Sequence, residues 1–185
     1  MTALASRGQL RASFLRWALV IVPAISLLGF LAGRYAPGGP GDAWFDSLIK
    51  PAVYPPPAAF AIVWPVLYGL MGLALTMVAT ARGAPGRGPA VAAFLVQLAI
   101  NLCWPPVFFA AHRIAAGLYL ILALDVAVLV TIALFWRVRR PAALMLLPYL
   151  AWIAFATVLN WQILLANPDA DGGAGASNAA SRIEF

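Results

Sequence analysis

Five apolar stretches, each long enough to cross a lipid bilayer as a helix, constrain this chain more than any other feature. They cover about residues 14–34, 57–80, 88–111, 117–136 and 141–165. Because a helix rises about 1.5 Å per residue, roughly 20 residues span a hydrocarbon core of ~30 Å. Of the 185 residues, 64% are hydrophobic and only 10% are charged. The sequence therefore predicts an all-α integral membrane bundle of five transmembrane helices.

The composition excludes a soluble monomer and offers no support for nucleic-acid binding. Soluble domains are usually about 45–50% apolar and ~25% charged. The formal net charge is +6, but a basic excess on so apolar a chain indicates membrane orientation and anionic headgroups. We interpret residues 1–166 as a single transmembrane domain. Residues 167–185 are rich in Asp, Gly, Ala, Ser and Asn, which is typical of a flexible tail.

Catalytic and metal-binding motifs are missing from the sequence. Cys103 and His112 are each the only residue of their type, so the sequence predicts no disulfide, no metal site and no required cofactor. There is also no Walker loop, no G-x-S-x-G and no H-E-x-x-H. Hydrolytic and ATP-driven reactions therefore have no recognisable machinery.

The cations alternate in number between successive connections, and this alternation predicts the orientation. One side would carry eight of them and the other side four. The first set is Arg7, Arg11, Arg16, Arg82, Arg87, Arg137, Arg139 and Arg140, and the second is Arg34, Lys50, Arg113 and Arg182. Because Lys and Arg accumulate in cytoplasmic loops, we expect a cytoplasmic N-terminus and a C-terminus on the opposite side.

The connection from Tyr35 to Pro56 is the only long one between the predicted spans. A loop longer than about 12–15 residues is usually functional or disordered. Stiff prolines and aromatic residues favour order here, so we expect a lid over one end of the bundle. The candidate lid residues are Trp44, Phe45, Lys50, Pro51, Pro55 and Pro56.

Several aromatic and polar residues are predicted at one depth inside the spans. They are Trp64, Tyr68, Asn101, Trp104 and Asp125, which would lie roughly 10–17 Å below the outer surface. A single aromatic stripe is commonly helix packing or an interfacial belt. Because this layer is too deep for a belt and contains polar groups, we prefer a ligand cavity. Asp125 has two equal interpretations, a functional group or a carboxyl bonded to a neighbouring helix.

Motifs in the same order along residues 20–165 resemble the TspO/MBR family, the tryptophan-rich sensory proteins of bacteria and the translocator proteins of mitochondria. The matching segments are Pro23 with G-F-L-A-G-R, Trp44-Phe45, Leu48 to Pro51, Pro55-Pro56, Trp64 to Gly72, Gln97 with Asn101, Trp104 to Phe109, and Pro148 to Trp152. The resemblance implies a bacterial membrane protein, commonly a homodimer, with a cavity for porphyrins such as protoporphyrin IX or heme. By position, Trp64, Asn101 and Trp152 match ligand-contacting residues of the family.

Two positions depart from the family pattern. Val53 stands where the loop usually has an aromatic residue, with Tyr54 beside it, so the lid contacts are expected to differ. In the sterol-recognition segment, Leu159 and Trp161 are followed by no Lys or Arg before the tail. This absence speaks against high-affinity sterol binding.

The resemblance leaves three functions open. The first is a receptor or carrier that binds porphyrins and takes part in tetrapyrrole regulation or transport. The second is an enzyme that degrades porphyrin in light with the help of Trp64 and Trp152, and the third is a porphyrin or sterol transporter. In each case we expect Arg34, Lys50 and Arg113, which share one side with the lid, to attract the porphyrin carboxylates.

Overall fold

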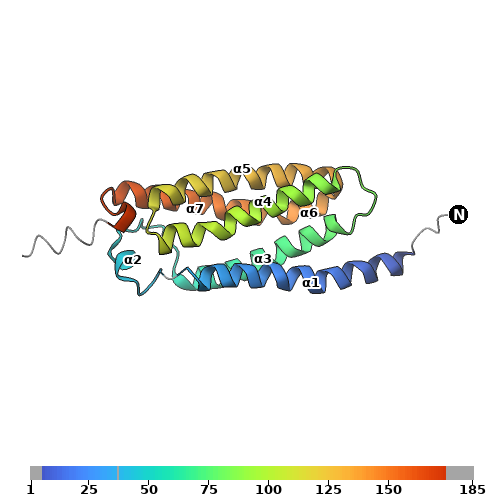
Figure 1. Cartoon of the computed structure of the whole chain (residues 1–185), viewed down its shortest axis with the longest axis horizontal. Helices are drawn as coiled ribbons and strands as arrows, with labels where there is room; N and C mark the ends of the chain where they lie inside the picture. Colours follow the sequence, from blue (N-terminus) through green and yellow to red (C-terminus); the bar gives the residue numbers. More distant parts are fainter. Residues whose placement is uncertain (1–5, 37, 174–185) are drawn as a thin grey trace, which may run out of the picture.

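The long helices lie side by side along one axis of the molecule (Figure 1). The structure is a computed structural model that describes residues 6–36 and 38–173. Its elements are α1 (Arg7–Arg34), α2 (Ala43–Ser47), α3 (Pro57–Ala79), α4 (Arg87–Pro105), the π-helical turn η1 (Pro106–Ala110), α5 (Ile114–Val138), α6 (Arg140–Met145), α7 (Leu147–Ala166) and the 3-10 turn η2 (Asp171–Gly173).

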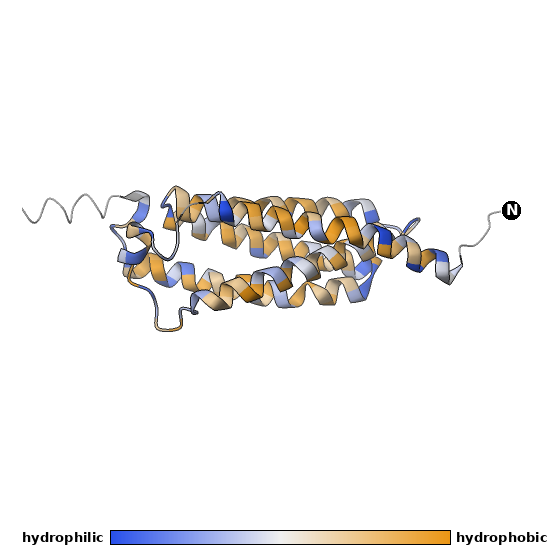
Figure 2. Cartoon of the chain, turned by 90° about the horizontal axis from the view of Figure 1, so that it is seen from below, coloured by the Kyte–Doolittle hydropathy of each residue, from blue (hydrophilic) through white to orange (hydrophobic). Residues whose placement is uncertain are grey.

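Five segments are long and apolar enough to cross a membrane. They are Gly8–Arg34, Pro57–Ala79, Arg87–Ala110, Ile114–Val138 and Arg140–Ala166. Apolar colour fills the middle of the bundle, while hydrophilic residues gather toward its two ends (Figure 2). The predicted all-α class with five membrane-spanning helices is therefore confirmed, and no strand occurs in the described residues.

Local sequence signals explain where several helices begin and change geometry. Helix α1 begins at Arg7, earlier than its apolar run, because Ser6 and Gln9 form a capping box: Ser6 Oγ accepts from Gln9 N at 3.3 Å, and Ser6 N donates to Gln9 Oε1 at 2.8 Å. Helix α3 begins with Pro57, whose missing N–H costs nothing there. Pro105 and Pro106 lack the N–H groups that the α-helical hydrogen-bond pattern needs, and the chain forms a π-helical turn from Pro106.

Helix α1 packs mainly against α3, α4 against α5, and α5 against α7. The core of these contacts contains fully buried large side chains, among them Met71, Phe94, Phe135 and Tyr149. Large apolar residues also face outward, such as Leu19, which is 76% exposed. An exposed apolar belt of this kind is stable in lipid and would aggregate in water.

Gly29 permits the close approach of α1 and α3. A Cβ atom at this position would overlap the ring of Tyr68, whereas a Cβ at Gly33 would have no neighbour within 4 Å. The G-x-x-x-G spacing of α1 therefore serves a contact within the bundle, and only its first glycine makes that contact.

The lid and the arginine-rich segments occupy opposite ends of the bundle. Helix α2 and the segment after α7 lie at one end, and the beginning of α1 extends from the other (Figure 1). The loop between α3 and α4 and the junction of α5 with α6 share the second end, because residues from both surround one hollow together with α1.

Candidate ligand-binding site

Trp64, Tyr68 and Asn101 come together in the bundle interior. Trp64 and Tyr68 are one turn apart on α3, and their rings stack with centroids 5.3 Å apart. The Tyr68 hydroxyl donates to Asn101 Oδ1 on α4 at 2.8 Å. This arrangement joins a flat aromatic surface to a buried hydrogen-bonding group, which is the combination that an amphipathic aromatic ligand requires.

Further polar groups on α4 and α7 are buried near this aromatic pair. Gln97 lies one turn before Asn101 on the same face of α4, and its side-chain amide has no hydrogen-bond partner among the described residues. The same holds for the Tyr149 hydroxyl and for Trp152 Nε1. Tyr149 and Trp152 belong to the apolar cluster that includes Trp64 and Tyr68. Buried polar groups normally find partners, so these three side chains offer hydrogen-bonding capacity to a ligand.

Asp125 bonds to a neighbouring helix. The Thr157 hydroxyl of α7 donates to Asp125 Oδ2 at 2.8 Å, whereas Oδ1 has no partner among the described residues. A carboxyl in this position holds α5 against α7, which agrees with the second of its two interpretations. It leaves one oxygen available to another group.

Trp104 lies under the lid, away from the Trp64 pair. Its ring stacks on Phe108 with centroids 4.8 Å apart, and its Nε1 donates to the carbonyl oxygen of Gly117 at 3.1 Å. Phe108 in turn contacts Trp44 of the lid. The predicted layer of aromatic residues is therefore divided into two groups, one on α3 and α4 in the core and one at the lid.

Trp152 lies at the side of the bundle between α3 and α7. Its ring packs edge-on against Phe60 at 5.6 Å between centroids. It also lines an apolar groove of about 510 Å³ together with Val63, Leu67 and Phe155. Trp152 thus contacts both the core and a groove on the flank of the bundle.

The first long loop is ordered and folds onto the end of the bundle. Trp44 and Phe45 of α2 are only 6% and 2% exposed. Trp44 stacks on His112 with centroids 4.3 Å apart, and Phe45 packs edge-on against Phe109 at 5.5 Å. The aromatic lid residues therefore cover η1 and the turn that precedes α5.

Tyr54 supplies the aromatic contact that Val53 cannot make. Its ring lies 6.2 Å from that of Phe45 and 5.7 Å from that of Phe60, between centroids, while Val53 is 60% exposed. Partial burial raises the pKa of the Tyr54 phenol further above physiological pH. Tyr54 thereby connects α2 to the first turn of α3, and Pro51, Pro55 and Pro56 stiffen the chain around it.

Residues after α7 fasten the lid. Asn167 Oδ1 accepts from Ile49 N at 2.8 Å, and Asn167 Nδ2 donates to Ile49 O at 2.9 Å. Trp44 Nε1 donates to Ala170 O at 3.0 Å. The composition of 167–185 predicts a flexible tail, yet residues 167–172 make these ordered contacts, and residues 174–185 lie outside the described part. Sequence reasoning missed Asn167 because its partners lie 118 residues away.

The three candidate carboxylate anchors differ in their surroundings. Arg34 and Arg113 are exposed. Lys50 is held inside the lid, where its Nζ donates to Phe45 O at 2.6 Å and to Leu48 O at 3.3 Å. The charged groups of Arg34 and Arg113 are therefore more accessible to a ligand than the ammonium group of Lys50. Within the described residues, no group of three His, Cys, Asp or Glu side chains could hold a metal ion.

Together these features define a class: a five-helix membrane protein with an aromatic and polar interior and an ordered lid at one end. Comparison with known proteins gives the family within that class. The TspO/MBR family profile matches residues 19–166, so the chain belongs to the TspO/MBR family.

Curated relatives from bacteria and animals support this membership. Protein CrtK of Rhodobacter capsulatus is 35% identical over 146 residues, which are 78% of this chain and 89% of the relative. The tryptophan-rich protein TspO of Chlorobaculum tepidum is 37% identical over 142 residues, 76% of this chain and 89% of the relative. The translocator protein of Bos taurus is 37% identical over 150 residues, 77% of this chain and 88% of the relative.

Proposed function

We propose that the protein is a membrane receptor or carrier that binds porphyrins such as protoporphyrin IX, or heme, with a role in tetrapyrrole regulation or transport. The observation that carries the proposal is the stack of the half-buried Trp64 on the buried Tyr68, beside the buried Asn101. A flat macrocycle gains affinity by stacking on such rings, and the unpaired side chains of Gln97 and Tyr149 offer it hydrogen bonds.

The porphyrin carboxylates would lie toward the lid end of the bundle. Arg34 and Arg113 are exposed there, and guanidinium groups bind carboxylates in a bidentate geometry. The lid would then exclude water from the bound macrocycle. The proposal also includes a homodimer in a bacterial membrane and a cytoplasmic position for the arginine-rich end.

A light-dependent porphyrin-degrading enzyme is the second candidate. Trp64, whose ring contacts Tyr68, would donate an electron to the light-excited porphyrin, and dissolved O2 would accept an electron from the reduced macrocycle. Trp152 would be the second donor. A transporter is the third candidate, and the groove between α3 and α7 would favour lateral exchange of its cargo with the lipid.

Titration of the purified full-length chain with protoporphyrin IX in the dark tests binding. We expect saturable quenching of tryptophan fluorescence that Trp64→Ala weakens. Subsequent illumination distinguishes the candidates, because unchanged porphyrin absorbance favours the receptor. A product that forms only with intact Trp64 and Trp152 favours the enzyme, and the absence of saturable binding would refute the proposal.

A further inference from the structure

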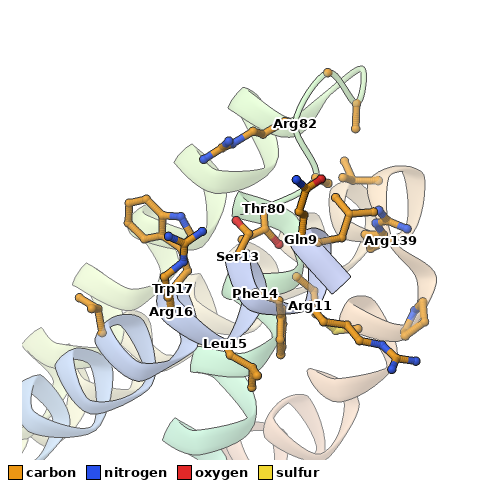
Figure 3. A pocket seen from close by; sticks show the side chains of 18 residues that line it. Gln9, Arg11, Ser13, Phe14, Leu15, Arg16, Trp17, Thr80, Arg82 and Arg139 are labelled. Carbon is orange, nitrogen blue, oxygen red and sulfur yellow. The ribbon is translucent and has the colours of Figure 1, made fainter. Parts of the chain in front are cut away.

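A wide hollow lies at the end of the bundle opposite the lid. It has a volume of about 1530 Å³ and is bounded by the first half of α1, the end of α3 with the loop that follows, and the junction of α5 with α6. Figure 3 shows side chains from these segments around it. The volume exceeds the ~300–1,000 Å³ of typical small-molecule pockets, so the hollow has room for a larger amphipathic molecule.

The lining is amphipathic. Apolar side chains on α1, α3 and α5, including Phe14, Met77 and Val138, form part of the wall. Ser13 and Thr80 add hydroxyl groups, and Trp17 lies beside Arg16 (Figure 3). A lining that combines an apolar wall with polar and cationic groups matches a ligand that has an apolar body and a charged head.

Four arginines contribute positive charge to this hollow, and none of the described residues that line it is acidic. They are Arg11, Arg16, Arg82 and Arg139. The bounding ranges 9–20, 77–84 and 138–141 contain no Asp or Glu, and the acidic residue Asp42 belongs to the lid at the other end. All four side chains are exposed and lie around the hollow on different sides (Figure 3), so together they make its surroundings electropositive. The charge distribution therefore selects an anionic ligand.

The position of the hollow indicates where that ligand comes from. Arg11 and Arg16 precede or begin the apolar run of α1, so they lie where the hydrocarbon core meets the lipid headgroups. Anionic lipids carry their phosphate at this depth. Arginine is also suited to phosphate, because its planar guanidinium donates two parallel hydrogen bonds.

We propose that this hollow binds one anionic phospholipid of the surrounding bilayer. The phosphate lies at the electropositive, arginine-lined edge of the hollow, and the acyl chains lie along the apolar wall that includes Phe14, Met77 and Val138. The site lies at the opposite end of the bundle from the lid, so it is separate from the porphyrin site proposed above. A lipid in this position would fasten the first half of α1 to the rest of the bundle.

Native mass spectrometry of the full-length chain in detergent tests the proposal with dioleoyl phosphatidylglycerol and dioleoyl phosphatidylcholine, which share their acyl chains. We expect one tightly retained phosphatidylglycerol per chain and weaker, unsaturated retention of phosphatidylcholine. Each cation beside anionic lipid multiplies affinity roughly fivefold. The double variant Arg82→Gln with Arg139→Gln should therefore bind phosphatidylglycerol about 25-fold more weakly.

A matched control distinguishes lipid binding in the hollow from attraction of the lipid by the overall positive charge of this end. Arg137→Gln with Arg140→Gln removes the same number of charges from the same end, but neither residue lines the hollow. This control should retain the parent affinity within about twofold. If the first variant fails to fold, Arg11→Gln with Arg16→Gln replaces it, because Arg16 Nε donates only within its own helix, to Ala12 O at 3.3 Å.

Three outcomes would overturn the proposal. Equal losses in the two double variants would mean that the lipid recognises the charge of the whole end. Competition by sn-glycerol 3-phosphate at concentrations equal to the lipid would assign the site to a soluble phosphate compound. Displacement of phosphatidylglycerol by protoporphyrin IX in proportion to its binding would assign the hollow to porphyrin.

Discussion

Tyr68 connects the aromatic and polar parts of the interior because its ring stacks on Trp64 and its hydroxyl bonds to Asn101. Gly29 makes room for this ring, since any side chain there would overlap it. The positions of Gly29 on α1, Tyr68 on α3 and Asn101 on α4 thus depend on one another. A change at any of them is expected to affect both packing and ligand binding.

At the residue scale, we expect Trp64→Ala to weaken porphyrin binding. Loss of one stacked aromatic ring costs about 1–3 kcal/mol, or roughly 5- to 150-fold in affinity. Fluorescence titration in the dark measures this loss. Trp161→Ala is the matched control, because Trp161 is 52% exposed on α7. Equal losses in the two variants would mean that tryptophan removal acts through general destabilisation.

Tyr68→Phe separates the hydrogen bond from the stack. The ring remains on Trp64, while Asn101 Oδ1 loses its donor in a buried position. Interhelical hydrogen bonds in membrane proteins contribute about 0.6–1.7 kcal/mol, so the melting temperature should fall modestly. Gly29→Ala should lower it more, because α1 and α3 must separate around the new methyl group. A smaller effect for Gly29→Ala than for Tyr68→Phe would contradict this contact.

At the scale of elements, the lid is attached from two directions. Its prolines limit the conformations of the chain before α3, and the segment after α7 holds α2 and Ile49 through hydrogen bonds. The lid therefore combines intrinsic stiffness with a tertiary attachment. The two contributions can be removed separately.

Replacing Pro55, Pro56 and Pro57 by glycine should accelerate porphyrin release. Glycines enlarge the set of loop conformations, so the closed form becomes rarer and more costly to order. Stopped-flow quenching of tryptophan fluorescence measures association and dissociation, and the off-rate should change more than the on-rate. If both rates match the parent, the loop is a passive linker and the ligand enters elsewhere.

Asn167→Ala should loosen the lid from the other direction. The substitution removes hydrogen bonds to Ile49 N, Ile49 O and Ile163 O. Hydrogen exchange at the amide of Ile49 should become faster by about 5- to 15-fold, because one net hydrogen bond contributes ~1–1.5 kcal/mol. Asp169→Ala is the control in the same segment, since Asp169 is exposed. Unchanged protection in Asn167→Ala would exclude the attachment.

At the scale of the whole molecule, charge and lid divide the bundle into two unlike ends. The lid end contains Asp42, Asp46 and Asp171, while the other end gathers arginines around a hollow. Such a division predicts one preferred orientation in the bilayer. By the positive-inside rule, we expect the arginine-rich end on the cytoplasmic side.

Cysteine labelling in intact cells tests that orientation in a Cys103→Ala background. A cysteine in place of the exposed Pro85, between α3 and α4, should react only after the membrane is made permeable. A cysteine in place of Val53, which is 60% exposed in the lid, should react from outside. The reverse pattern would invert the orientation and place the lid in the cytoplasm.

The membrane spans and the family motifs could be predicted from the sequence because both depend on residues that are close together along the chain. Hydropathy over about 20 residues decides whether a helix is stable in lipid, and each motif, such as Trp64 to Gly72, is continuous. The start of α1 at Arg7 also has a local sequence signal, because Ser6 and Gln9, three residues apart, form a capping box.

The arrangement of the site required the tertiary structure. Asp125 bonds to Thr157 across 32 residues, and Asn167 bonds to Ile49 across 118. Trp104 shares its predicted depth with Trp64 but packs with Phe108 in the cluster under the lid. Depth follows from counting residues along a helix, whereas the rotation of each helix about its axis depends on its neighbours. The sequence by itself therefore determined which segments are long and apolar enough to cross the membrane, and only the packing of the helices decided which of their residues meet.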